Sequence, residues 1–88
     1  MHTNLITGAL PDGHETPISN SAADIVRMGF NPSNLPKADA IKGLAAALIS
    51  ECEALRDEGG KGAREASIAI TKLQEASMFG VAAATADL

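Results

Sequence analysis

Two long stretches of the chain carry hydrophobic residues at the spacing of an amphipathic helix. In the first, expected over about residues 36–58, apolar positions recur at three- and four-residue intervals and form one stripe: Ile41, Leu44, Ala45, Leu48, Ile49, Cys52 and Leu55. Pro36 suits the first position of this helix. Gly59 and Gly60 supply the conformational freedom for a helix end and a tight turn.

The second stretch predicts a helix over about residues 63–85. One face of it holds small and apolar side chains that should pack on the first stripe: Ala66, Ala69, Ile70, Leu73, Ala76, Ser77, Gly80, Val81 and Ala84. Because only a short glycine loop joins the two stretches, they predict an antiparallel helical hairpin.

The chain before the hairpin has a different character. Residues 1–20 contain Gly8, Pro11, Gly13 and Pro17, which are typical of turns and loops, and we expect a flexible, extended arm there. Ser21 can cap a short helix over about residues 21–28, and Gly29 would stop it. The predicted fold is therefore all-α, with an arm over 1–20 and a helical hairpin domain over 21–88.

The outward faces of both predicted long helices are only half polar. On the second helix this face carries Arg64, Ser67, Thr71, Gln74, Glu75 and Met78, with Ile68 and Phe79 at its edge. The first helix presents Ala46, Ala47, Ser50 and Ala54. A two-helix hairpin with such faces is not expected to be stable alone, so the pattern favours a homo-oligomer.

Composition supports self-association and limits which classes of partner the chain can bind. The chain has 88 residues, which limits it to one domain, and Phe30 and Phe79 are its only aromatic residues. The formal net charge is −4, which argues against binding to DNA or RNA polymers but permits a small anionic ligand held by local cations. The sequence has neither a signal-peptide pattern nor an apolar run long enough to span a membrane, so we expect a cytoplasmic protein.

No arrangement typical of catalysis or metal binding is evident. His2 and His14 both lie in the predicted arm, and Cys52 stands alone on the apolar stripe, where we expect a buried small side chain. The glycines near residue 60 lack the strand and the Lys-Ser/Thr pair of a phosphate-binding loop. The sequence thus predicts a non-enzyme with no catalytic residue, no metal and no cofactor.

A few polar residues could nevertheless bind an anion. Arg64, with Lys61 and the free amides of a helix start, could hold a phosphate, or could simply pair with a neighbouring acid. Ser67 and Thr71 follow Arg64 along one face, and their hydroxyls could contact a ligand or bond back to the helix. Lys37 could simply be solvated. Phe30 could pack on the hairpin or stack on a base.

These segments resemble a known family. The stretches FNPSNLPKADAIK, AAALISECE and REASIAITKLQEASMFG are similar to the phage-encoded anti-CBASS cyclic-nucleotide sponges, whose helical hairpin domain is shared with the anti-Thoeris sponges. The resemblance runs from about residue 29 to residue 86. In the last-helix pattern the position after Met78 is often Trp, and here it is Phe79.

The resemblance implies a fold and a function. Such sponges are all-helical homo-oligomers, typically hexamers, that bind cyclic dinucleotides, and often cyclic trinucleotides, between subunits without cleaving them. Sequestering the messenger blocks host CBASS immunity in the host cytoplasm. The matching ligand-binding candidates are Arg64, Thr71 or Ser67, and Lys37, with Phe30 for base stacking and Ile68 on the same face. The alternatives are a small helical oligomerisation or adaptor module with protein partners, and an enzyme that degrades cyclic nucleotides.

Overall fold

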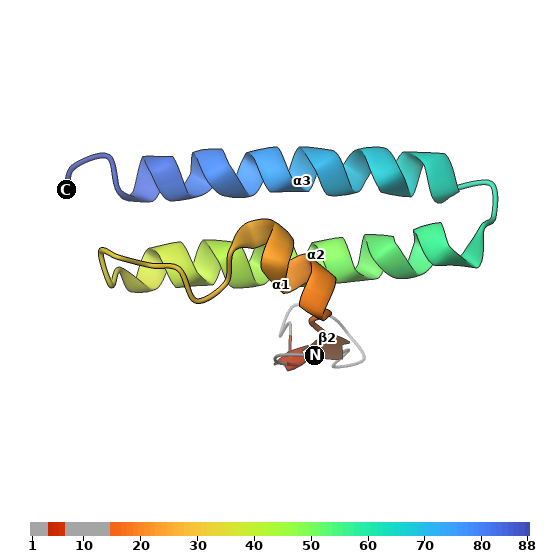
Figure 1. The fold of residues 1–88 in the computed structure, drawn as a ribbon, viewed down its shortest axis with the longest axis horizontal. Coiled ribbons are helices and arrows are strands. Elements are labelled where there is room, and N and C mark those ends of the chain that lie inside the picture. Colours follow the sequence, from red (N-terminus) through yellow and green to blue (C-terminus); the bar gives the residue numbers. More distant parts are fainter. Residues whose placement is uncertain (1–3, 7–14) are drawn as a thin grey trace.

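The computed structural model describes residues 4–6 and 15–88 as a short strand pair and three helices, of which two form a long antiparallel hairpin (Figure 1). The all-helical hairpin predicted from the sequence is thereby confirmed. A small helix lies against the first long helix, beside the two strands. The elements in chain order are β1 Asn4–Ile6, β2 Glu15–Pro17, α1 Asn20–Val26, α2 Pro36–Glu58 and α3 Ala63–Ala84.

The ends of the helices follow local chemistry. Pro36 occupies the start of α2 after an extended Leu35, and Gly59 ends α2 in the left-handed conformation, with φ of 73°. Helix α1 begins earlier than the predicted residue 21, because Ser19 rather than Ser21 is its N-cap, and the Ser19 hydroxyl accepts from the Ala22 amide at 3.0 Å. It also ends earlier than residue 28, at Val26.

Part of the predicted arm is packed against α2. Residues 15–17 pair antiparallel with residues 4–6, Thr16 is buried, and Ile18 is fully buried. The Thr16 hydroxyl donates to the Glu51 carboxylate at 2.8 Å, and the Ser19 amide donates to the Ser50 hydroxyl at 3.0 Å. Ile18 is large and apolar, but the turn-forming residues around it gave no indication that it would be buried. The rest of the predicted arm, 1–3 and 7–14, lies outside the described residues.

The buried side of α2 differs from the predicted stripe. Ala46 and Ala47, expected on the open face, are buried, whereas Leu44, Leu48 and Leu55 are each half exposed or more. Both α1 and β2 contact α2 in addition to α3. Because they cover a second side of this helix, its buried arc is turned away from the leucines. Among the described residues only Ile18 and Ile49 are both large and fully buried, so the core is small.

The face of α3 that docks on α2 is largely the predicted one. Ala66, Ile70 and Ser77 are buried there, whereas Ala76 is exposed. Gly80 permits close approach of the helices, since a Cβ at this position would lie 3.0 Å from Cγ2 of Ile41. Cys52 is half-buried at the margin of the core.

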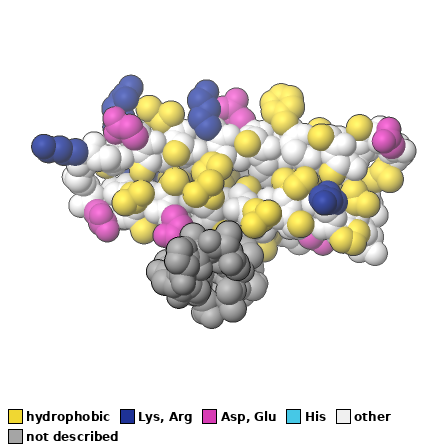
Figure 2. All heavy atoms as spheres, turned by 180° about the vertical axis from the view of Figure 1, so that it is seen from behind, with side chains coloured by type: hydrophobic (Ala, Val, Ile, Leu, Met, Phe, Trp, Pro, Cys, Tyr) yellow, Lys and Arg dark blue, Asp and Glu magenta, His cyan; other side chains and the backbone are white. Residues whose placement is uncertain are grey.

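Many large hydrophobic side chains remain at the surface. Figure 2 shows such side chains along both long helices, with charged side chains mostly towards the edges and ends. None of the helices in the described part of the chain combines the length and apolar character that a membrane span requires. Within the part of the chain that the structure describes, the exposed large hydrophobic residues are Phe30, Leu44, Leu48, Leu55, Ile68, Met78, Phe79 and Leu88.

Candidate functional site

The candidate residues of α3 are all exposed near the start of this helix. Arg64, Ser67, Ile68 and Thr71 lie within its first nine residues, and their spacing places them along one side. The closest acidic group to Arg64 among the described ion pairs is the Glu65 carboxylate at 4.0 Å. Both of these side chains are more than two-thirds exposed, so this pair is weak and leaves the guanidinium accessible to an anion.

The hydroxyl of Thr71 is turned back towards its own helix. It donates to the carbonyl oxygen of Ser67 at 3.4 Å, which is long for a hydrogen bond between oxygen atoms. The bond is exposed to solvent. Of the two roles considered from the sequence, the structure shows the bond back to the helix, and contact with a ligand stays a prediction.

Lys37 and Phe30 lie at the other end of the hairpin. Lys37 is the second residue of α2 and Arg64 is the second residue of α3. Because the helices are antiparallel, about 30 Å of helix axis separates these two cations. One chain alone does not bring Lys37 and Arg64 together, and only a second subunit could place both on one ligand.

The structure reveals a buried lysine that sequence reasoning missed. Lys42 is 7% exposed, and its Nζ donates to the carbonyl oxygens of Arg27, at 3.2 Å, and of Phe30. The same ammonium lies 5.5 Å from the centroid of the Phe30 ring, which is within the range of a cation–π contact. Lys42 thus fixes the turn after α1 and the position of Phe30.

A signal for Lys42 was present in the spacing. It lies four residues after Ala38 and four before Ala46, and all three are buried. A lysine in a helix is ordinarily solvated, so the sequence favours the apolar stripe containing Leu44 instead. The burial of Ala38, Lys42 and Ala46 is recognised only once α1 is seen to pack against α2.

The described residues offer no ready metal centre. No group of three or more His, Cys, Asp or Glu side chains is arranged to hold an ion within residues 4–6 and 15–88. His2 and His14 lie outside the described residues. The exposed hydroxyls and cations described above are suited to binding an anion.

Comparison with known proteins now defines the family. The family model of the Acb2/Tad1 hairpin domain matches residues 23–85, from within α1 to the residue after α3. The chain belongs to the Acb2/Tad1 hairpin family. This is the anti-CBASS and anti-Thoeris sponge family, and the resemblance noted in the sequence is confirmed. No curated protein and no solved structure matches the chain.

The Acb2/Tad1 match covers every candidate ligand-binding residue. Phe30, Lys37, Arg64 and Thr71 all fall inside it, together with the buried Lys42. Ser19 and the two strands precede it. The N-terminal segment that packs on α2 is therefore outside the part of the chain that defines the Acb2/Tad1 hairpin.

Proposed function

We propose that this Acb2/Tad1 hairpin protein binds cyclic dinucleotides, and also cyclic trinucleotides, and sequesters them without cleavage. Removing the messenger would keep the host CBASS effectors inactive in the cytoplasm of an infected cell. The observation that carries the proposal is the family match over residues 23–85, which spans both long helices and all candidate site residues.

Electrostatics supports a pocket between subunits. A cyclic dinucleotide carries two phosphate groups, and each can accept charge-assisted hydrogen bonds from a cation. Arg64 of one subunit and Lys37 of another would supply such cations from opposite ends of their hairpins. The Thr71 and Ser67 hydroxyls would bind the ring, and Ile68 would contact its apolar parts.

Phe30 would stack on a nucleobase of the ligand. Phe30 is 60% exposed, so a nucleobase could reach its side chain while Lys42 holds the residue in place. Neither tyrosine nor tryptophan occurs in the sequence to replace it.

The proposed assembly is a homo-oligomer, with the hexamer as the proposed size. Leu44, Leu48 and Leu55 are exposed along α2 at positions that a second chain could cover. The small core supports the same conclusion, because association would bury apolar area that the single chain leaves in water. The same surfaces would also suit a small adaptor with protein partners, which is the competing function.

Ligand release distinguishes these functions. The full chain is incubated with a cyclic dinucleotide, freed of unbound ligand and denatured by heat, and the supernatant is analysed by chromatography. We expect the ligand to be retained and then released unchanged. An altered ligand would instead indicate an enzyme, and the absence of uptake across a panel of cyclic di- and trinucleotides would leave the adaptor.

A further inference from the structure

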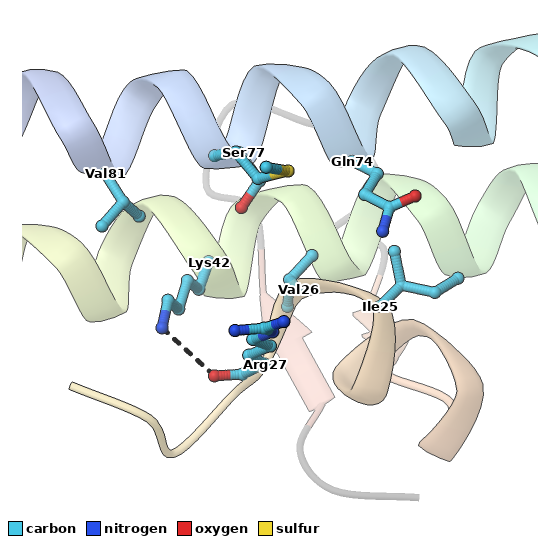
Figure 3. A pocket seen from close by; sticks show the side chains of 8 residues that line it. Ile25, Val26, Arg27, Lys42, Gln74, Ser77 and Val81 are labelled. Atoms are coloured by element: carbon cyan, nitrogen blue, oxygen red, sulfur yellow. Dashed lines mark hydrogen bonds between the residues drawn. The ribbon is translucent and has the colours of Figure 1, made fainter.

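A cavity of about 370 Å³ lies where α1, α2 and α3 meet (Figure 3). Its volume is at the lower end of the range of about 300–1,000 Å³ that is usual for small-molecule sites. Ile25 and Val26 of α1 and Val81 of α3 form part of an apolar wall. The lining comes from all three helices of one chain, and neither Arg64 nor Thr71 contributes to it.

The charges around this cavity are unbalanced. Arg27 and Lys42 line it, and none of the lining residues is acidic. Lys42 uses its ammonium to bind the carbonyl oxygens of Arg27 and Phe30, and one of its three donors remains. The Arg27 guanidinium has no ion pair or hydrogen bond within the described part of the chain. A local double positive charge thus stands out in a chain whose net charge is −4.

A buried hydroxyl also faces the cavity. Ser77 is only 4% exposed, and its Oγ has no hydrogen-bond partner among the described residues. Serine in a helix commonly bonds to the carbonyl four residues earlier, so a buried hydroxyl without such a bond is unusual. Figure 3 shows the Ser77 oxygen directed away from α3, towards Lys42, with the Gln74 amide on the same side of the helix.

The backbone at Arg27 ends helix α1. This residue caps α1 in the left-handed conformation, with φ of 58° and ψ of 51°. Helices commonly end at a left-handed residue, and the Met28 amide closes this end by donating to the Ala23 carbonyl oxygen at 2.9 Å. The carbonyl oxygen of Arg27 is bound by Lys42, so the residue is anchored beside the other cation.

We propose that this cavity is a binding site, complete within one subunit, for a small organic phosphate. A phosphate monoester is a dianion and balances the charges of Arg27 and Lys42, which a single carboxylate would not. The Arg27 guanidinium binds two phosphate oxygens, and the Ser77 hydroxyl and Gln74 amide bind polar atoms of the ligand. The apolar wall of Ile25, Val26 and Val81 contacts its organic part. This site is separate from the Arg64 surface and goes beyond the proposed sequestration.

Titration of the full chain with adenosine 5′-monophosphate, followed by NMR, tests the proposal. We expect saturable binding that shifts the Gln74 side-chain amide and the Ser77 backbone amide. Arg27→Gln should weaken binding at least about tenfold, because a charge-assisted hydrogen bond is lost. Arg56→Gln, at an arginine of α2 that does not line the cavity, is the matched control and should leave the affinity unchanged. Adenosine, which lacks the phosphate, should bind at least about tenfold more weakly.

Several outcomes would overturn the proposal. These are the absence of saturable binding, equal affinity in a folded Arg27→Gln protein, equal affinity for adenosine, or shifts confined to the Arg64 and Thr71 surface. Should Arg27→Gln fail to fold, Ser77→Ala serves as the second variant, and an unchanged affinity there is equally decisive against the site. Retention of cyclic dinucleotide is measured on the same proteins. If the wild-type protein binds the nucleotide monophosphate but does not retain cyclic dinucleotide, only the proposed sequestration is contradicted.

Discussion

The hydroxyl of Ser19 lies 2.5 Å from Oε1 of Glu53, to which it donates, and at the same time accepts from the Ala22 amide at 3.0 Å. The Ser21 hydroxyl donates to the other carboxylate oxygen of Glu53. One buried side chain of α2 therefore binds the N-cap and the first turn of α1. This connection places α1 on α2 and so forms one wall of the cavity.

Replacing Glu53 by alanine should destabilise the protein. The carboxylate is 7% exposed, and its loss leaves two serine hydroxyls without their acceptor. We expect the free energy of unfolding to fall by about 1–3 kcal/mol, the usual effect of leaving such groups unpaired. Urea unfolding at one fixed protein concentration measures the change.

Glu58→Ala is the matched control for this experiment. Glu58 is the last residue of the same helix and is exposed. Its removal should change the urea midpoint little. Equal midpoints for the Glu53→Ala and wild-type proteins would contradict the structural role of the Ser19–Glu53 contact.

Lys42→Met should loosen the turn that follows α1. Methionine retains most of the apolar stem but donates no hydrogen bond, so the carbonyl oxygens of Arg27 and Phe30 lose a donor. We expect a loss of stability of about 1–3 kcal/mol. Hydrogen exchange should quicken at the Met28 and Phe30 amides, which bond to Ala23 and Arg27 in this turn.

Lys61→Met provides the comparison for Lys42, because Lys61 is exposed in the loop between α2 and α3. It should leave both stability and amide exchange near residue 28 unchanged. If the Met28 and Phe30 amides of the Lys42→Met protein exchanged hydrogen at the wild-type rate, the lysine would not be what holds this turn.

Arg64→Ala should abolish cyclic dinucleotide binding without dissociating the oligomer. The guanidinium is exposed and makes only a weak contact with Glu65, so its removal should not affect folding. Calorimetry measures the affinity, and sedimentation measures the mass. Lys72→Ala, another exposed cation on α3, is the control and should bind normally. Unchanged affinity in a well-assembled Arg64→Ala protein would remove Arg64 from the site.

Leu48→Glu should reduce the mass of the assembly. Leu48 is half exposed between Leu44 and Leu55 on α2, and a charge there could not be buried against another chain without a large penalty. We expect the wild-type protein to sediment at several times its chain mass of 9.0 kDa, and the variant at a lower mass. Ala86→Glu, beyond the end of α3, should assemble like wild type. A wild-type monomer at micromolar concentration would remove the inter-subunit pocket.

Local chemistry is sufficient to define much of the hairpin. Pro36 and Gly59 act on the backbone of their own neighbourhood, and they lie at the start and the C-cap of α2 in the structure. The apolar periodicity of α3 likewise indicates the face that packs on α2, because a helix repeats its orientation every few residues. Arg64, Ser67 and Thr71 could be singled out because they interrupt this pattern on the opposite side.

Contacts between residues far apart in the sequence could not be predicted from local chemistry or periodicity. Ser19 and Glu53 are separated by 34 positions, and Lys42 reaches a carbonyl 15 positions away. Periodicity within α2 favoured the stripe of Leu44, Leu48 and Leu55 and gave no indication that α1 would cover a neighbouring side. The cavity between the three helices was hidden for the same reason.

The sequence by itself thus determined an all-helical hairpin, its glycine turn, the polar positions Arg64, Ser67 and Thr71 on α3 and its Acb2/Tad1 character, because these depend on neighbouring residues and on a continuous motif. The tertiary structure alone decided which side of α2 is buried, that Lys42 and Glu53 are interior charges held by hydrogen bonds, and that Arg27 and Ser77 meet at one cavity. The physical reason is that burial depends on which elements pack against each other, and α1 contacts both α2 and α3.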